Sequence, residues 1–155
     1  VTVFYLVWEP ETGRIEYAVG GHNPPVFVEA GGQARTLPGK GPALGVIPVS
    51  QFHNYELTFA PGDVLLLYTD GVTEAINALE EEFGMERLMQ VSASMRSASA
   101  AELVDAVAGA VAEHARGLES FDDMTMVVIK RLVSESVPTG CRSYIPPGSR
   151  PRSGK

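Results

Sequence analysis

The feature that most constrains this chain is an unbroken apolar run, Val64–Tyr68, which is followed closely by Asp70 and a glycine. A Pro-Gly-Asp turn signal precedes the run, and a short apolar segment after such a signal is typical of a strand buried on both faces. Because an unpaired charge is costly to bury, a carboxylate at the end of such a strand usually has a metal ion, a cation or a hydrogen-bond donor as its partner. Asp70 is therefore a candidate functional residue. The alternative is that it caps a helix that begins near Thr73.

The composition narrows the classes of protein to which the chain can belong. Its 155 residues suit one domain, and no apolar segment approaches the roughly 20 residues that cross a bilayer. Residues 1–133 contain 18 Asp and Glu against 8 Lys and Arg, a net charge of −10 that argues against a nucleic-acid partner. A single cysteine, Cys141, excludes an internal disulfide, and no signal peptide is recognisable. We therefore expect a cytoplasmic protein with no membrane segment and no nucleic-acid partner.

Alternating and β-branched segments predict strands along most of the chain. The strands are expected at residues 1–8, 14–19, 25–28, 34–37, 55–59, 64–68 and 126–129. Residues 1–8 are apolar on both alternating sets, which is typical of an interior strand. Turn residues after the first and third of these segments predict two hairpins. His22, in the glycine- and proline-rich segment between the hairpins, is either a metal or phosphate ligand or a hydrogen-bonded loop residue.

Two helices are expected between the last two strands. Met85, Leu88 and Met89 recur near helical spacing, and Ser99 to Glu102 form a capping-box sequence that opens a second helix. This second helix is expected to end near Gly117. His114 lies close to its apolar stripe and is expected to be a boundary residue rather than a ligand.

A second group of carboxylates, Asp122-Asp123, comes just before the strand expected at 126–129. If that strand and Val64–Tyr68 are antiparallel neighbours, the end of one and the start of the other lie at the same edge of the sheet. Clustered oxygen ligands without cysteine or a histidine pair suit Mg²⁺ or Mn²⁺ rather than Zn²⁺. Such a site lowers the pKa of a bound water and holds a phosphoryl group. The alternative is that the two aspartates only cap a turn.

Together these segments resemble the PPM-type, metal-dependent serine/threonine phosphatases, in the bacterial branch related to the sporulation stage II protein E and the sigma-factor-regulating phosphatases. The most specific motifs are Tyr-Thr-Asp-Gly-Val-Thr-Glu-Ala at 68–75 and Asp-Asp-Met-Thr at 122–125. Further matching segments lie, in family order, at 4–5, 11–13, 18–25, 43–45, 57–63, 66–67 and 83–84. The resemblance implies an α+β fold, a four-layer α-β-β-α sandwich of antiparallel sheets flanked by helices.

The resemblance also implies a centre of two Mn²⁺ or Mg²⁺ ions in the complete domain. It makes Asp70 and Asp122 metal-binding, catalytic residues and places Asp123 beside them as a further metal ligand. The supporting residues that it implies are Gly71, where the chain turns beside the ion, and Thr73 and Thr125, which orient the ligands. The implied reaction is attack of a metal-activated water on phosphoserine or phosphothreonine, with no covalent enzyme intermediate.

One ligand of the family pattern has no counterpart in this sequence. The metal-bridging aspartate of the family, which a glycine follows, belongs to an earlier strand, and no acid before Asp70 has that setting. We therefore expect residues 1–132 to be the C-terminal portion of a PPM-type phosphatase domain that lacks its N-terminal portion. Residues 133–155 are rich in Pro, Gly, Ser and Arg and are expected to be a disordered tail.

The partners expected from the resemblance are those of a signalling enzyme. They are a phosphorylated protein substrate of the anti-sigma-factor antagonist type and a sensor domain upstream in the parent chain. The alternative, which the missing bridging ligand motivates, is a catalytically impaired, phosphatase-like regulatory or binding module.

Overall fold

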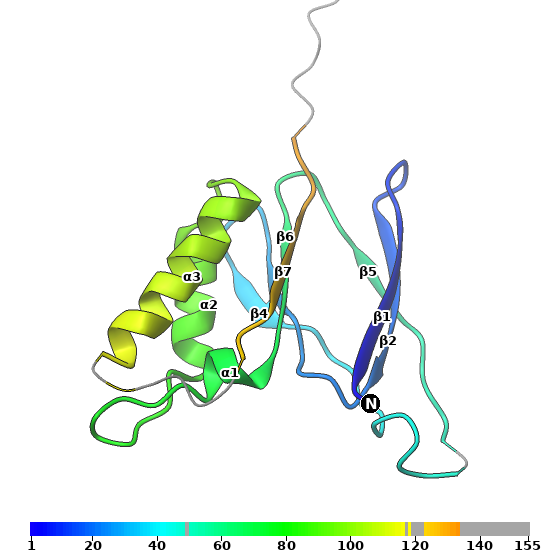
Figure 1. Ribbon diagram of the computed structural model, residues 1–155. Helices are drawn as coiled ribbons and strands as arrows, with labels where there is room; N and C mark the ends of the chain where they lie inside the picture. Colours follow the sequence, from blue (N-terminus) through cyan, green and yellow to red (C-terminus); the bar gives the residue numbers. More distant parts are fainter. Residues whose placement is uncertain (49, 117, 119–122, 134–155) are drawn as a thin grey trace, which may run out of the picture.

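The computed structural model of the 155-residue chain describes residues 1–48, 50–116, 118 and 123–133. The elements in chain order are β1 (Val3–Glu9), β2 (Arg14–Gly20), β3 (Val26–Val28), β4 (Ala34–Thr36), β5 (Tyr55–Thr58), β6 (Val64–Tyr68), α1 (Asp70–Thr73), α2 (Gly84–Ser94), α3 (Ala100–His114) and β7 (Met126–Lys130). Two antiparallel sheets face each other, and α2 and α3 cover the outer face of one of them (Figure 1). The α+β class expected from the sequence is confirmed. In the part of the chain that the structure describes, no helix covers the outer face of the other sheet.

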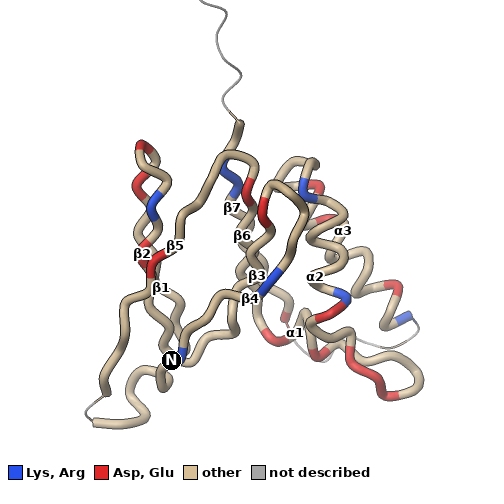
Figure 2. Tube along the Cα trace, turned by 180° about the vertical axis from the view of Figure 1, so that it is seen from behind, with Lys and Arg blue, Asp and Glu red and all other residues tan. Residues whose placement is uncertain are grey.

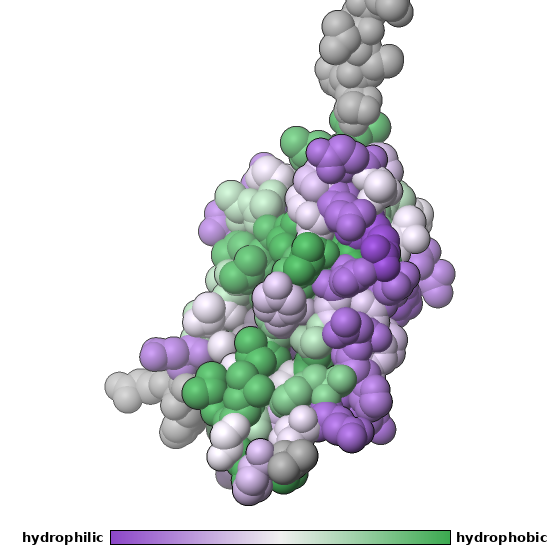
Figure 3. All heavy atoms as spheres, turned by 90° about the vertical axis from the view of Figure 1, so that its right-hand side faces the viewer, coloured by the Kyte–Doolittle hydropathy of each residue, from purple (hydrophilic) through white to green (hydrophobic). Residues whose placement is uncertain are grey.

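The uncovered sheet has the strand order β1-β2-β5. β1 and β2 form the predicted hairpin, with Val3 opposite Gly20 and Glu9 opposite Arg14. The prediction that residues 1–8 form an interior strand is wrong for the described residues, because β1 lies at the edge of this sheet. Its outward side chains, Tyr5 and Val7, are 63% and 47% exposed. Figure 3 shows this side of the molecule, where hydrophobic and hydrophilic surfaces lie next to each other.

The covered sheet has the strand order β4-β3-β6-β7, so that β6 is an interior strand. β3 and β4 form the second predicted hairpin. Val64, Leu65 and Leu66 of β6 are fully buried, which confirms the strand expected from the apolar run. The reason is geometrical: one face of β6 meets the opposite sheet and the other meets the helices, so both alternating sets of side chains are removed from water.

Two hydrophobic clusters hold these layers together. The first lies between the sheets and includes Ile15, Phe27 and Phe59. The second lies between the covered sheet and the helices and includes Leu66, Leu88, Leu103 and Val107. Successive residues of β6, Leu65 and Leu66, belong to different clusters. β6 therefore contributes side chains to both hydrophobic clusters, and packing on its two faces fixes the position of its end.

The helices follow the local signals in the sequence. α3 begins with the expected capping box, in which the Ser99 hydroxyl accepts the Glu102 N–H at 3.2 Å and the Glu102 carboxylate accepts the Ser99 N–H at 2.7 Å. It ends at His114, and the expected end near Gly117 lies outside the described residues. Within the described ranges, none of the helices has the length and apolarity that a bilayer crossing requires. The predicted tail at 133–155 also lies outside them, apart from Val133.

Candidate active site

Asp70 lies where β6 ends, at the edge of the sandwich that carries α1 (Figure 1). Asp70 is the first residue of the short helix α1 and Thr73 is the last. The alternative that Asp70 caps a helix beginning near Thr73 is therefore wrong, because the helix begins at Asp70 and Thr69 occupies the N-cap position. Asp70 is exposed, and its Oδ1 accepts the N–H of Gly71 at 3.2 Å. The Asp70 carboxylate is therefore at the surface, and this hydrogen bond is to the backbone of the next residue.

β6 and β7 are antiparallel neighbours, as the carboxylate argument from the sequence required. Their ladder runs from Val64 opposite Lys130 to Tyr68 opposite Met126. Beyond the ladder, the N–H of Thr69 donates to the carbonyl oxygen of Thr125 at 3.0 Å. The end of β6 and the start of β7 therefore meet at one edge, and the segments bearing Asp70 and Asp123 lie side by side.

A threonine hydroxyl joins the same two segments. Thr69 Oγ1 accepts the N–H of Thr125 at 2.9 Å and donates to the carbonyl oxygen of Asp123 at 3.1 Å. With the backbone bond of Thr69, three hydrogen bonds connect this one residue to residues 123–125. The residue before Asp70 in the sequence is therefore in direct contact with Asp123.

The remaining site residues expected from the sequence have different positions. Asp122 lies outside the described residues, and Asp123 is exposed. The Thr73 hydroxyl donates to the carbonyl oxygen of Asp70 at 3.3 Å, so it contacts the backbone of the expected ligand. Gly71 is buried inside α1 and does not have a positive φ, so a left-handed conformation is not the reason for a glycine there.

The donors present at this edge fit part of a site for a hard divalent cation. Asp70 and Asp123 offer carboxylate oxygens, which Mn²⁺ and Mg²⁺ prefer. Within the described ranges, however, no group of three or more His, Cys, Asp or Glu side chains is placed to hold an ion. The described residues thus fit the edge of a metal centre and do not complete one.

Acidic side chains gather around this edge. Figure 2 shows Asp and Glu positions along α1 and the loop that follows it. Glu74 and the three consecutive residues Glu80, Glu81 and Glu82 are exposed there. An exposed cluster of one sign raises the local concentration of counter-ions, so this edge attracts cations.

The two histidines singled out in the sequence have local partners. His22 Nδ1 lies 2.9 Å from the carbonyl oxygen of Asn23, and its ring lies 6.3 Å from that of Phe4. His114 Nε2 lies 2.8 Å from the carbonyl oxygen of Glu81, which confirms a boundary residue with a satisfied ring nitrogen. Both contacts match the hydrogen-bonded interpretation of these residues.

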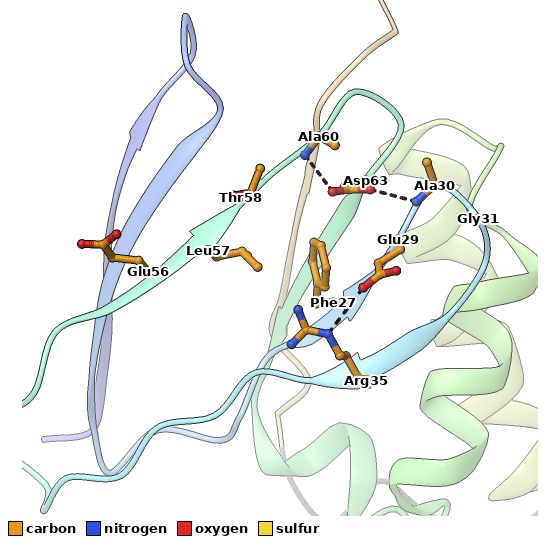
Figure 4. A pocket seen from close by; sticks show the side chains of 10 residues that line it. All are labelled: Phe27, Glu29, Ala30, Gly31, Arg35, Glu56, Leu57, Thr58, Ala60 and Asp63. Carbon is orange, nitrogen blue, oxygen red and sulfur yellow. Dashed lines mark hydrogen bonds and ion pairs between the residues drawn. The ribbon is translucent and has the colours of Figure 1, made fainter.

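A cavity of about 540 Å³ lies at the other end of the sandwich (Figure 4). Phe27, Arg35, Glu56 and Asp63 are among its lining residues. The Asp63 carboxylate that faces it already accepts the N–H groups of Ala30 and Ala60 at 2.8 and 2.7 Å. Because Asp63 precedes β6 and Asp70 follows it, this cavity is separate from the candidate active site.

Thr69 is the site residue that the sequence argument missed. It lies inside the Tyr-Thr-Asp-Gly motif, but a threonine before a helix predicts an N-cap and gives no sign of a contact with a distant segment. Its neighbour Tyr68 is buried, and burial raises the pKa of its phenol to about 12. The phenol hydroxyl of Tyr68 donates to Met85 Sδ at 3.7 Å, inside the cluster between the covered sheet and the helices.

Comparisons with known proteins identify relatives of this chain. Protein IcfG of Synechocystis sp. is 35% identical over 130 residues, which is 84% of this chain and 20% of that protein. The phosphoserine phosphatase RsbU of Bacillus subtilis is 25% identical over 136 residues, which is 86% of this chain and 39% of that protein. The chain thus spans well under half the length of these relatives.

A solved structure has the same fold. The phosphatase domain of the cell fate determinant SpoIIE from Bacillus subtilis, presoaked with Mn, superposes with a TM-score of 0.66 at 18% identity, over 84% of this chain and 56% of that one. In addition, the family model for stage II sporulation protein E matches residues 1–132, which include all the described elements. The chain therefore belongs to the stage II sporulation protein E (SpoIIE) family.

Proposed function

We propose that residues 1–132 are the C-terminal portion of a metal-dependent phosphatase domain that hydrolyses phosphoserine or phosphothreonine on a regulatory protein. The observation that supports this most strongly is the meeting of the segments bearing Asp70 and Asp123 at one edge, where Thr69 bonds to both Asp123 and Thr125. The relationship to a protein named phosphoserine phosphatase supports the same reaction class.

In this proposal, carboxylates from both segments hold two divalent ions, Mn²⁺ or Mg²⁺. The proposed ligands are Asp70, Asp122 and Asp123, and the remaining ligands come from outside the described residues. When bound, the ions activate the attacking water and offset the charge of the phosphoryl group. Thr73 keeps the backbone of Asp70 in place, and Thr125 keeps that of the second segment.

The proposed substrate is a phosphorylated anti-sigma-factor antagonist, and a sensor domain in the full-length protein is the proposed source of regulation. The sequence resemblance to the sigma-factor-regulating phosphatases motivates this assignment, and the relatives named phosphoserine phosphatase RsbU and RsbP support a phosphoserine-containing substrate. Because the exposed acidic surface around α1 repels a negatively charged phosphoprotein, we expect cations to bind before the substrate.

The test is Mn²⁺-dependent phosphate release from a phosphorylated antagonist protein by the full-length protein. Asp70→Asn and Asp122→Asn are each expected to abolish release, because each removes a charged oxygen ligand and keeps the side-chain size. Asp105→Asn is the matched control, since Asp105 is exposed on α3. Full turnover by both site variants would contradict the proposal.

Calorimetric titration with Mn²⁺ separates the enzyme from a binding module. Uptake of two ions by the full-length protein, with loss of affinity in Asp70→Asn, is expected for the phosphatase. A folded protein that binds its partner but takes up no Mn²⁺ would instead be a phosphatase-like regulatory module.

A further inference from the structure

The hydroxyl of Thr69 bonds to a segment distant in sequence and does not cap α1, the helix that Thr69 precedes. The residue has φ −88° and ψ 161°, the extended N-cap conformation in which a threonine hydroxyl usually accepts an N–H from the first turn. In the described structure α1 has no such side-chain cap. The hydroxyl bonds to Thr125 and Asp123 instead, so a distant contact has replaced the local one.

These bonds hold residues 123–125 against Thr69. Thr69 Oγ1 receives the N–H of Thr125 and donates to the carbonyl oxygen of Asp123, while the Thr69 N–H bonds to the carbonyl oxygen of Thr125. Residues 123–125 are exposed and lie beyond the β6–β7 ladder, so strand pairing does not fix their position. The hydroxyl therefore supplies two of these three hydrogen bonds that hold residues 123–125 near Asp70, and its bond to Asp123 is the one that reaches furthest from the ladder.

We infer that Thr69 is a positioning residue of the proposed metal site, acting through its hydroxyl to set the spacing between Asp70 and Asp123. The inference rests on the proposed function. Thr69 does not bind the ion in this account. It adds side-chain hydrogen bonds between the two ligand-bearing segments beyond the end of the β6–β7 ladder, and partners of this kind typically change metal affinity by about 10–100-fold when they are lost.

The experiment compares Thr69→Val with Thr69→Ser in the full-length protein. Valine keeps the β-branched shape and removes the hydroxyl, whereas serine keeps the hydroxyl. Thr69→Val is expected to weaken Mn²⁺ binding, measured by calorimetry, about 10–100-fold, and Thr69→Ser is expected to restore it. Amide hydrogen exchange at Thr125 should accelerate in Thr69→Val only, because its N–H loses its acceptor.

The matched control is Thr12→Val in the β1–β2 turn, at the opposite end of the sandwich (Figure 1). Its hydroxyl accepts the N–H of Arg14 at 3.1 Å and lies 3.1 Å from the Glu9 carboxylate, so the same chemical change breaks similar local bonds. This variant is expected to bind Mn²⁺ normally. If Thr69→Val does not fold, Thr69→Ala replaces it, since alanine adds no methyl group in the place of the hydroxyl.

The experiment separates failure of this inference from failure of the proposed function. If Asp70→Asn loses Mn²⁺ binding while the hydroxyl-free Thr69 variant binds as well as the unmodified protein, the inference is overturned and the phosphatase proposal stands. An equal loss in Thr69→Ser, or in Thr12→Val, also overturns it. If Asp70→Asn binds Mn²⁺ normally, the metal site itself is wrong and the role of Thr69 fails with it.

Discussion

Arg131 Nη1 donates a hydrogen bond to the carbonyl oxygen of Phe59 at 2.6 Å, and so joins the two sheets at the end remote from Asp70. Arg131 follows β7 in one sheet, and Phe59 follows β5 in the other. Nη2 of the same side chain lies 3.2 Å from the carbonyl oxygen of Pro10 in the β1–β2 turn. One guanidinium thus contacts two segments that are far from Arg131, and from each other, in sequence.

We expect Arg131→Ala to lower the free energy of unfolding by about 2 kcal/mol, because a bond from a charged donor is lost and a partly buried carbonyl is left without it. Urea unfolding measures the change. Arg116→Ala, at an exposed arginine paired with Glu113, is the control and is expected to change stability by less than about 0.5 kcal/mol. Equal effects of the two substitutions would contradict a stabilising role for the Arg131 contact.

The two glycines Gly13 and Gly109 are expected to respond to alanine with opposite signs. Gly13 has φ +76°, and a Cβ there would lie 2.6 Å from the carbonyl oxygen of Phe59, so Gly13→Ala is expected to destabilise the protein. Gly109 lies inside α3, and a Cβ added to it would meet no described neighbour within 4 Å, so Gly109→Ala is expected to stabilise the protein by about 0.5–1 kcal/mol. Thermal unfolding of both variants measures the signs, and a stabilised Gly13→Ala would show that the close contact is wrong.

The capping box at the start of α3 gives a third prediction. Ser99→Ala removes the hydroxyl that accepts the Glu102 N–H and is expected to cost about 1 kcal/mol of stability. Ser94→Ala is the control, because the Ser94 hydroxyl only bonds back to Val91 near the end of α2. Denaturant unfolding compares them. A loss in Ser94→Ala as large as that in Ser99→Ala would argue against the cap as the cause.

The buried phenol of Tyr68 predicts an alkaline dependence of stability. Burial raises its pKa from 10.0 to about 12 in the folded protein, so the folded state holds this proton more strongly than the unfolded state. The resulting contribution is fully present below pH 10 and is lost as the pH rises from about 10 to about 12. The loss of stability in this range, measured by urea unfolding, is expected to be smaller in Tyr68→Phe.

Tyr5→Phe is the control for this alkaline profile, because Tyr5 is 63% exposed. It should lose stability over the same pH range as the unmodified protein. If Tyr68→Phe and the unmodified protein lose stability in parallel between pH 10 and pH 12, the phenol of Tyr68 does not cause the loss.

Much of the secondary structure was predictable because its signals lie within a few residues of each other. The apolar run of β6, the two hairpins and the capping box at Ser99 all depend on local period, turn residues or a spacing of three. The position of Asp70 at the end of a buried strand was predictable for the same reason. By contrast, both sides of β1 are apolar in sequence, and only the sheet order places that strand at an edge.

The sequence by itself determined which residues form strands and that carboxylates follow one buried strand and precede another. Only the tertiary structure decided that β6 and β7 are neighbours, that Thr69 bonds to residues 123–125, and that Arg131 reaches Phe59. The physical reason is that a hydroxyl or guanidinium has several possible partners of similar energy, a helix N–H or a distant backbone group among them. Which partner it takes depends on segments that packing brings together from more than 50 residues away.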